Sequence, residues 1–464
     1  MATEKKGNTP TLLDFENQVS PYYNEGHAAF RKHVRVFVEK EILPYYQKWE
    51  QDGKIPRDLL KKVAAHGGIF MFPWGLGETE WKGYKWDPFY SIVFAQEMVK
   101  AGGVNSLWIH NMRGKQKKKK DLFPSLCNKI MCFLKIILIC EQSLPPVLFF
   151  GKNAIHKQCV REVVSGEKVI SLAISELRGG SDVAQIATQA VLVTDPNDNK
   201  QYYIINGGLY YINCSLLNFK KKILTRGKKL YLICTNKLFF LLCLNKKKKK
   251  ESIGLHLGVG RIILVYVHTY TKNKQPNEGS EMSETAQVTF KDVKVPVENV
   301  IGEVNEGFKI VMYGFNNERF IIACSCVAAG RLCVEESIQW ARERETFGKK
   351  LSSHQVIRHK IAEMSRLVLA THAFLERTAY QIQHDRLGQK DKSIPRNIAL
   401  LKVQSSRMLQ QVVIEASQIF GGRSYVRTGR GAVIDRIYRI VRSQAIAGGS
   451  EEILLDFVTR QAKL

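Results

Sequence analysis

The chain has 464 residues, of which 45% are hydrophobic and 10% aromatic, a composition typical of globular proteins that excludes a disordered or fibrous one. This length exceeds a single hydrophobic core, so we expect two or three packed units that share one active site. Of the formal net charge of +27, a surplus of 19 falls in residues 113–140 and 214–250, so the charge belongs to two segments and gives no reason to expect a specific nucleic-acid partner.

The beginning of the chain carries no readable targeting signal. It lacks the apolar run of a signal peptide, and Glu4 and Asp14 argue against an acid-poor transit peptide, so the cytoplasm and the mitochondrial matrix both stay open. The most apolar windows, 130–140 and 230–244, are shorter than the roughly 18 residues that a membrane-spanning helix needs, so we expect no membrane span. The scattered cysteines form no CxxC pair, and we expect reduced thiols and no metal site.

The first predicted elements are helices. Apolar residues recur at spacings of three and four over 26–68 and again over 87–104, with prolines marking the ends of runs. Such spacing places the apolar side chains on one face of a helix. We therefore expect an α-helical N-terminal domain at 1–168, with a basic insertion at about 113–141.

Short strands are predicted next. Runs of β-branched and aromatic residues, bounded by Gly, Asn and Asp, predict strands at 170–174, 190–194, 202–205 and 287–290. They indicate a small middle β domain at 169–300, with a second basic insertion at about 214–250. Because like charges in blocks repel one another, we expect the poly-lysine runs of both insertions to be solvated and to lie outside the packed core. We favour insertions without a selected role over an electrostatic tether to nucleic acid or membrane.

Long helical patterns occupy the rest of the chain. They lie at 307–345, 354–384, 396–420 and 437–460. Four helices of this length should pack as a bundle, which we place at 301–464. The succession of helical, β and helical domains predicts an α+β fold.

A hydroxyl and a glycine turn follow the first predicted strand. Residues 173–176 read Ala-Ile-Ser-Glu and residues 179–182 read Gly-Gly-Ser-Asp. Such a turn lets backbone amides and a Ser hydroxyl approach a flat ring or a pyrophosphate closely. The string resembles the signature of the acyl-CoA dehydrogenases, and the resemblance implies contacts to the flavin ring and pyrophosphate of FAD and, through the second serine, to the bound thioester. The residues concerned are Leu172, Ile174, Ser175 and Ser181.

Three further strings resemble the same family. The first, at 211–213, reads Tyr-Ile-Asn and stands where the family has a Trp-Ile-Thr packed on the flavin. The second, at 342–348, reads Arg-Glu-Arg-Glu-Thr-Phe-Gly and is similar to a stretch that reaches the FAD of a neighbouring subunit. The third, at 418–422, reads Gln-Ile-Phe-Gly-Gly and is similar to a turn that receives the adenine. A helix C-cap would also explain the last glycines. The resemblance assigns FAD contacts from these strings and the last helix to Tyr211, Asn213, Arg344, Thr346, Phe347, Gln355, Gln418, Gly421, Gly422, Ser450 and Glu452.

The string at 445–453, Ala-Ile-Ala-Gly-Gly-Ser-Glu-Glu-Ile, resembles the family's Tyr-Glu-Gly-Thr-x-x-Ile, in which the Glu removes the α proton of the acyl thioester. Gly448 stands at the position of that Glu. Glu451 and Glu452 follow at the start of a predicted helix, where they turn away from this position and favour the positive end of the helix dipole. The usual base is therefore missing.

A Glu-Arg pair on an earlier helix supplies a candidate base. The isovaleryl-CoA and long-chain branches of the family carry their base in such a pair, and here the pair is Glu318 and Arg319. The resemblance implies that Glu318 is the catalytic base and that Arg319 contributes to substrate binding. Burial would raise the pKa of Glu318, and Arg319 would counter part of that rise. The alternative is a solvated ion pair on the helix surface.

The resemblance as a whole implies the acyl-CoA dehydrogenase fold, with FAD held across a homodimer or homotetramer interface. The implied reaction is the α,β-dehydrogenation of an acyl-CoA thioester to the 2-enoyl-CoA, as in fatty-acid β-oxidation or branched-chain acyl catabolism, with electron-transfer flavoprotein as the acceptor. Two alternatives stay open. One is an oxygen-using acyl-CoA or nitroalkane oxidase relative, and the other is a non-catalytic flavoprotein, because the β domain is interrupted from Cys214 onward.

Overall fold

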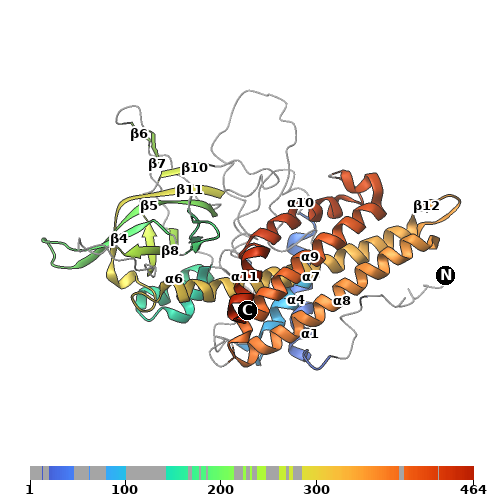
Figure 1. Ribbon diagram of the computed structural model, residues 1–464, viewed down its shortest axis with the longest axis horizontal. Coiled ribbons are helices and arrows are strands. Elements are labelled where there is room, and N and C mark those ends of the chain that lie inside the picture. Colours follow the sequence, from blue (N-terminus) through green and yellow to red (C-terminus); the bar gives the residue numbers. More distant parts are fainter. Residues whose placement is uncertain are drawn as a thin grey trace.

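A computed structural model of the chain shows a β-sheet at one side of the molecule and, beside it, a group of helices from both ends of the sequence (Figure 1). The expected succession of helical, β and helical regions is confirmed. For residue 171 and for the strand residues between 209 and 288, the structure describes the backbone and not the side chains. The described residues are 13, 20–45, 62, 80–100, 143–165, 170–176, 179–183, 186–213, 223–225, 230–232, 238–246, 261–267, 271–274, 285–385, 391–426 and 428–463.

The N-terminal helices begin where side chains complete the hydrogen bonding of the first turn. The side chain of Asn24 accepts a hydrogen bond from the backbone of His27, and Nδ1 of His27 accepts one from the backbone of Asn24, so two otherwise unpaired N–H groups are satisfied. Phe30 and Tyr90 then pack edge to face, with ring centroids 5.2 Å apart. The helices are α1 (Glu25–Phe37), the short π-helix η1 (Val38–Ile42), α4 (Pro88–Lys100) and α6 (Ala154–Val164).

The main sheet has seven strands in the order β10-β11-β5-β4-β8-β3, with β9 paired to β8. Between residues 202 and 206 of β5 the alternation of a half-buried strand is visible, because Tyr203 and Ile205 are buried while Tyr202 and Ile204 are only partly buried and Asn206 is exposed. The strands are β3 (Ile170–Ala173), β4 (Gln189–Thr194), β5 (Gln201–Asn213), β8 (Leu238–Lys246), β9 (Arg261–Val267), β10 (Thr271–Lys274) and β11 (Thr285–Pro296).

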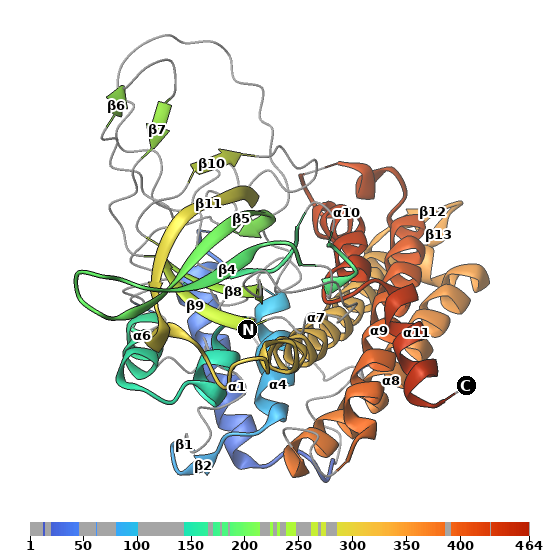
Figure 2. The same cartoon turned by 60° about the vertical axis from the view of Figure 1, so that its left-hand side comes forward.

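The second basic segment contributes a strand to this sheet, which the sequence did not predict. Strand β8 lies inside the insertion expected at about 214–250, and it pairs in parallel with both β3 and β4. Its sequence, Leu-Phe-Phe-Leu-Leu-Cys-Leu-Asn-Lys, has the apolar and aromatic side chains that suit a strand, and this local preference prevails over the flanking lysines. The pair β6 (Ile223–Thr225) and β7 (Leu230–Leu232) forms a separate sheet (Figure 2). The first insertion, at about 113–141, lies outside the described residues.

The C-terminal helices differ from the prediction at one point. The pattern at 437–460 forms two helices instead of one, because Gly448 and Gly449 have φ angles of +68° and +105°, which end a right-handed helix and which glycine adopts readily. The other three predicted helices are confirmed within a few residues. The helices are α7 (Gly307–Glu343), α8 (Gln355–His384), α9 (Ser393–Phe420), α10 (Ala432–Ile446) and α11 (Glu451–Gln461).

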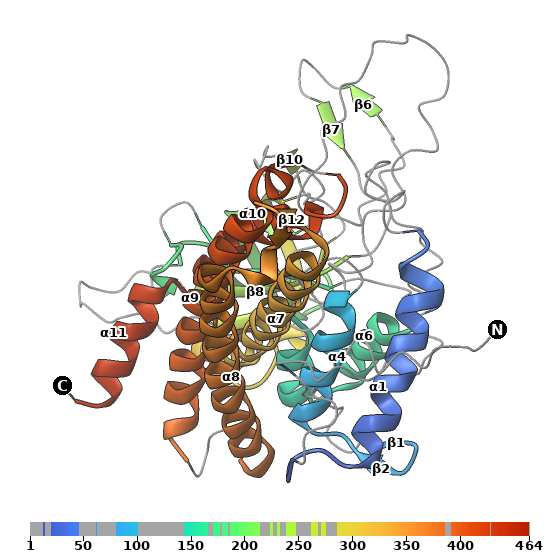
Figure 3. The ribbon, with the colours of Figure 1, turned by 90° about the vertical axis from the view of Figure 1, so that its right-hand side faces the viewer.

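Helix α7 forms the centre of the bundle. It contacts α4, α8, α9 and α10, and it lies side by side with α8 and α9 (Figure 3). A Cβ atom at Gly330 would come within 2.9 Å of Met408 Sδ, so α7 and α9 approach closely at this glycine. Polar side chains on such a helix need partners inside the protein, because water does not reach them. Within the described part of the chain, no helix is both long and apolar enough to cross a membrane.

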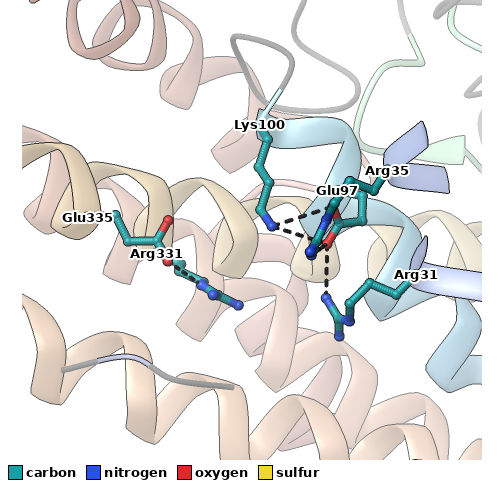
Figure 4. Close-up of polar contacts among 6 residues, drawn as sticks. All are labelled: Arg31, Arg35, Glu97, Lys100, Arg331 and Glu335. Carbon is teal, nitrogen blue, oxygen red and sulfur yellow. Dashed lines mark hydrogen bonds and ion pairs between the residues drawn. The ribbon is translucent and has the colours of Figure 1, made fainter. Parts of the chain in front are cut away.

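A buried ion cluster joins α1 to α4 (Figure 4). The side chain of Glu97 is 1% exposed and accepts hydrogen bonds from Arg35 at 2.8 and 2.9 Å, from Arg31 at 3.2 Å and from Lys100 at 3.2 Å. Burial by itself raises the pKa of Glu97, but the hydrogen bond from Arg35 and the charges of Lys100, Arg35 and Arg31 together hold it below its ordinary value. The Glu97 carboxylate is therefore the shared counter-charge of three cations.

Replacing Glu97 by Gln should destabilise the protein by about 3–5 kcal/mol at neutral pH, because three cations lose their buried counter-charge. The lowered pKa means that this stabilisation is complete above the unfolded-state pKa of about 4.3 and is lost as the pH falls through the folded-state value. Urea unfolding at pH 7 and at low pH measures both effects.

Glu335→Gln is the matched control. Glu335 pairs with Arg331 across one turn of α7 at 2.6 Å, and its side chain is 32% exposed (Figure 4). Loss of such a partly exposed pair costs only about 0–1 kcal/mol. Equal destabilisation by the two substitutions would contradict the structural importance given to Glu97.

Candidate active site

Two charged side chains lie next to each other on the buried part of α7. Glu318 is 7% exposed and Arg319 is 8% exposed. Both follow Phe315, whose ring lies 5.8 Å from the Arg319 guanidinium. The alternative that the pair is a solvated feature of the helix surface is therefore wrong.

Glu318 has the protonation behaviour of a general base. Burial raises the pKa of its carboxyl group, and the charges of Arg319 and Lys402 offset part of that rise, which leaves the pKa at about 7. A base is most effective when its pKa lies near the working pH, because it is then both ionised and able to hold a proton. The direction of the shift and the opposing effect of Arg319 agree with the sequence expectation, while the catalytic role stays a prediction.

Arg319 connects α7 to the turn between α10 and α11. Its Nε donates a hydrogen bond of 2.7 Å to the carbonyl oxygen of Gly448, and one Nη donates to Oδ1 of Asn316 at 2.9 Å. Burial lowers the pKa of Arg319 to about 10, against the opposing effect of Glu318, so the guanidinium is still charged at neutral pH. The cation thus ties α7 to the turn, and its charge acts on the neighbouring carboxyl group of Glu318.

Gly448, which occupies the position of the usual family base, lies beside Glu318. A Cβ atom built on Gly448 would stand 3.8 Å from Cδ of Glu318 and 3.3 Å from side-chain carbons of Arg319 and Ile322. A side chain at 448 would therefore begin within van der Waals distance of the carboxyl carbon of Glu318. The two positions share one place in the fold, so a carboxylate from α7 lies where the missing one would reach.

Lys402 is a third buried charge that the sequence did not single out. It lies on α9 with no exposed surface, and its Nζ donates to the carbonyl oxygens of Ala445 at 2.8 Å and Gly449 at 2.9 Å. Burial lowers its pKa to about 8. The available signal was its position on the apolar face of the predicted helix, four residues after Ile398 and seven before Leu409.

The predicted flavin segment lies at the same end of α7. Leu172 and Ile174 share a hydrophobic cluster with Phe315, one helical turn before Glu318. Ser181 and the neighbouring Gly180 are exposed, and a Cβ atom at Gly180 would meet nothing within 4 Å, so the turn leaves open space for a phosphate or a ring. Ser175 is half-buried at the strand end, so the described residues of this segment are compatible with the FAD contacts predicted for them.

Glu176 holds this turn in place, which the sequence did not predict. Its buried carboxylate accepts hydrogen bonds from the backbone N–H groups of Ala187 at 2.6 Å and Thr188 at 2.8 Å. Its own backbone pairs with that of Gly179. The carboxylate thereby ties the two ends of the loop together, and Ser181 between them is exposed.

Seven of the other predicted FAD residues form a second group at the far end of the bundle, near β12 (Glu345–Thr346) (Figure 1). At a helix rise of about 1.5 Å per residue, Arg344 lies about 39 Å from Glu318 along α7. Phe347 is 96% exposed, and Tyr425 is 91% exposed. The group consists of Arg344, Thr346, Phe347, Gln355, Gln418, Gly421 and Gly422.

Four predicted contacts fall outside these two groups. Tyr211 and Asn213 lie on β5, and their side chains are outside the described part. Ser450 precedes α11 directly after the Gly448 turn, whereas Glu452 is exposed on its first turn. Their contacts to FAD stay predictions.

Comparison with protein families and curated proteins identifies the relatives of the chain. A profile described as acyl-CoA dehydrogenase, N-terminal domain, matches residues 24–128, and one described as acyl-CoA dehydrogenase, C-terminal domain, matches residues 305–463. Acyl-CoA dehydrogenase AFT10-1 of Alternaria alternata is 30% identical over 446 residues, which cover 94% of this chain and 90% of that protein.

Solved structures share the fold. A probable acyl-CoA dehydrogenase of Mycobacterium abscessus has a TM-score of 0.73 at 26% identity, over 95% of this chain and 100% of that one. An acyl-CoA dehydrogenase of Bacillus anthracis, complexed with FAD, has a TM-score of 0.71 at 20% identity, over 95% of this chain and 67% of that one. Because the sequence relationship extends along nearly the whole chain and both helical regions match their own profiles, this protein belongs to the acyl-CoA dehydrogenase family of oxidoreductases.

Proposed function

We propose that the chain is an FAD-dependent dehydrogenase that oxidises the Cα–Cβ bond of a fatty or branched-chain acyl-CoA to give the 2-enoyl-CoA, with Glu318 as the base. The observation that supports this most directly is the buried carboxyl group of Glu318, which has a pKa of about 7 and lies beside Gly448. A carboxylate in this state can take a proton from a carbon acid at neutral pH.

The chemistry at the site divides between the cofactor and the chain. FAD, when bound, would supply the acceptor for the hydride that leaves Cβ. Glu318 takes the proton from Cα and becomes a neutral carboxylic acid, a form that its buried position favours. Arg319 keeps its charge throughout, because its pKa of about 10 lies above the working range, and it maintains the ionised fraction of Glu318 before the proton is taken.

The two groups of predicted FAD residues support assembly of at least a homodimer, or of a homotetramer built from dimers. Ser181 and the strand end beside it would hold the flavin end in one subunit. Arg344 would reach the same FAD from a neighbouring subunit, since it lies too far from Glu318 in its own chain. Phe347 and Tyr425 are large rings left in water by a single chain, and association would cover them. We propose electron-transfer flavoprotein as the electron acceptor.

Replacing Glu318 by Gln should leave FAD bound and slow its bleaching by acyl-CoA about 10²–10⁴-fold, because the amide cannot take the α proton. Anaerobic stopped-flow absorbance with a panel of straight and branched acyl-CoA thioesters measures the rate. Glu335→Gln, on the exposed side of the same helix, should bleach like the unaltered protein. Bleaching at the full rate in the Glu318 variant would rule out Glu318 as the base.

The rate of bleaching should increase with pH through about 7, since only the carboxylate form of Glu318 accepts a proton and its raised pKa places that form above this value. Below the pKa the rate should fall about tenfold for each pH unit. A rate that stays constant between about pH 5.5 and 8 would contradict the assigned pKa.

A further inference from the structure

Lys402 is a buried lysine with an unusual set of partners. An ammonium group without exposed surface loses its hydration, and it is tolerated only where the protein supplies replacements. Here the replacements are two backbone carbonyls, those of Ala445 and Gly449, at 2.8 and 2.9 Å. Both belong to the segment that surrounds Gly448, so Lys402 connects α9 to the turn that lies against Glu318.

The turn is held from two sides by cations. Carbonyl groups at the end of a helix lack partners within the helix and carry the negative end of its dipole. At the end of α10, Lys402 from α9 takes the carbonyls of Ala445 and Gly449, while Arg319 from α7 takes the carbonyl of Gly448. Removal of one cation leaves the turn attached on one side only.

We propose that Lys402 is a positioning residue for the base: it holds the Gly448 turn against Glu318 and supplies a buried positive charge that keeps the carboxylate ready to accept a proton. The inference rests on the proposed role of Glu318 and adds to it a residue on another helix. Lys402 itself need not touch the substrate, because its contacts are to the turn.

Among the ionisable groups near Lys402, Glu318 is the one whose pKa we expect to change when the charge of Lys402 is removed. Burial lowers the pKa of Lys402 to about 8, so it is mainly protonated at neutral pH. Burial raises the pKa of Cys326 to about 12, so this thiol stays neutral. Glu451 is hydrogen bonded by other side chains of α9. The ionisable groups that interact with Lys402 are Cys326, Glu318 and Arg319 from α7 and Glu451 and Glu452 from α11.

Three substitutions separate charge from hydrogen bonding. Lys402→Met removes both, Lys402→Gln keeps a neutral donor, and Lys402→Arg keeps a charged donor. Without the cation, the apparent pKa of flavin bleaching should rise by about one unit, since an opposite charge no longer favours the carboxylate. The Met and Gln variants should then bleach about tenfold more slowly at pH 6. The Arg variant should keep the original pH profile.

Lys360→Met is the control, because Lys360 of α8 forms a partly exposed ion pair with Glu415, which lies on α9 as Lys402 does. It should leave the pH profile unchanged. Unchanged profiles in the Met and Gln variants would overturn the proposal. If the Arg variant and the two neutral variants all fail to fold and bind FAD, Lys402 serves stability alone, and this result would also overturn the proposal. If Glu318→Gln is fully active, the proposed base is wrong; if it is inactive and the Lys402 profiles do not move, only this inference fails.

Discussion

The loss of water around three charged side chains is the constraint on which the site depends. Glu318, Arg319 and Lys402 are all buried between α7, α9 and the turn before α11. Ions in such surroundings are stable only with partners, and removing one partner leaves another charge unpaired. Burial raises the pKa of the Glu318 carboxyl group, and the charges of Arg319 and Lys402 limit that rise, which leaves the pKa at about 7.

The glycine break between α10 and α11 supplies the partners of the two cations. In a continuous helix the carbonyl groups of this segment would bond to N–H groups one turn later and would be unavailable. The positive φ angles of Gly448 and Gly449 interrupt that pattern and expose three carbonyls to Arg319 and Lys402. The same glycine removes the side chain that would otherwise compete with Glu318 for space. One local conformation therefore clears the site and supplies the carbonyl oxygens that accept hydrogen bonds from its two cations.

The length of α7 organises the rest of the molecule. Its first third carries Glu318 and shares a hydrophobic cluster with the predicted flavin segment, while its far end leads to Arg344 and the exposed Phe347. Helix α4 packs against α7 and is itself tied to α1 through Glu97. The N-terminal helices thus complete the burial of α7, and a straight helix of this length keeps the two groups of predicted FAD residues apart in one chain.

The sequence by itself determined the order of helical and β regions and the three longest helices, because apolar periodicity and glycine turns are local properties. Resemblance to a family pointed to Glu318 and to the vacancy at Gly448. Only the tertiary structure decided that these two positions meet, that Lys402 holds the turn around Gly448, that Glu176 closes the loop predicted to contact the flavin and that β8 enters the sheet. Each of these depends on contacts between residues far apart in the chain and on the burial that follows, and a local pattern carries neither.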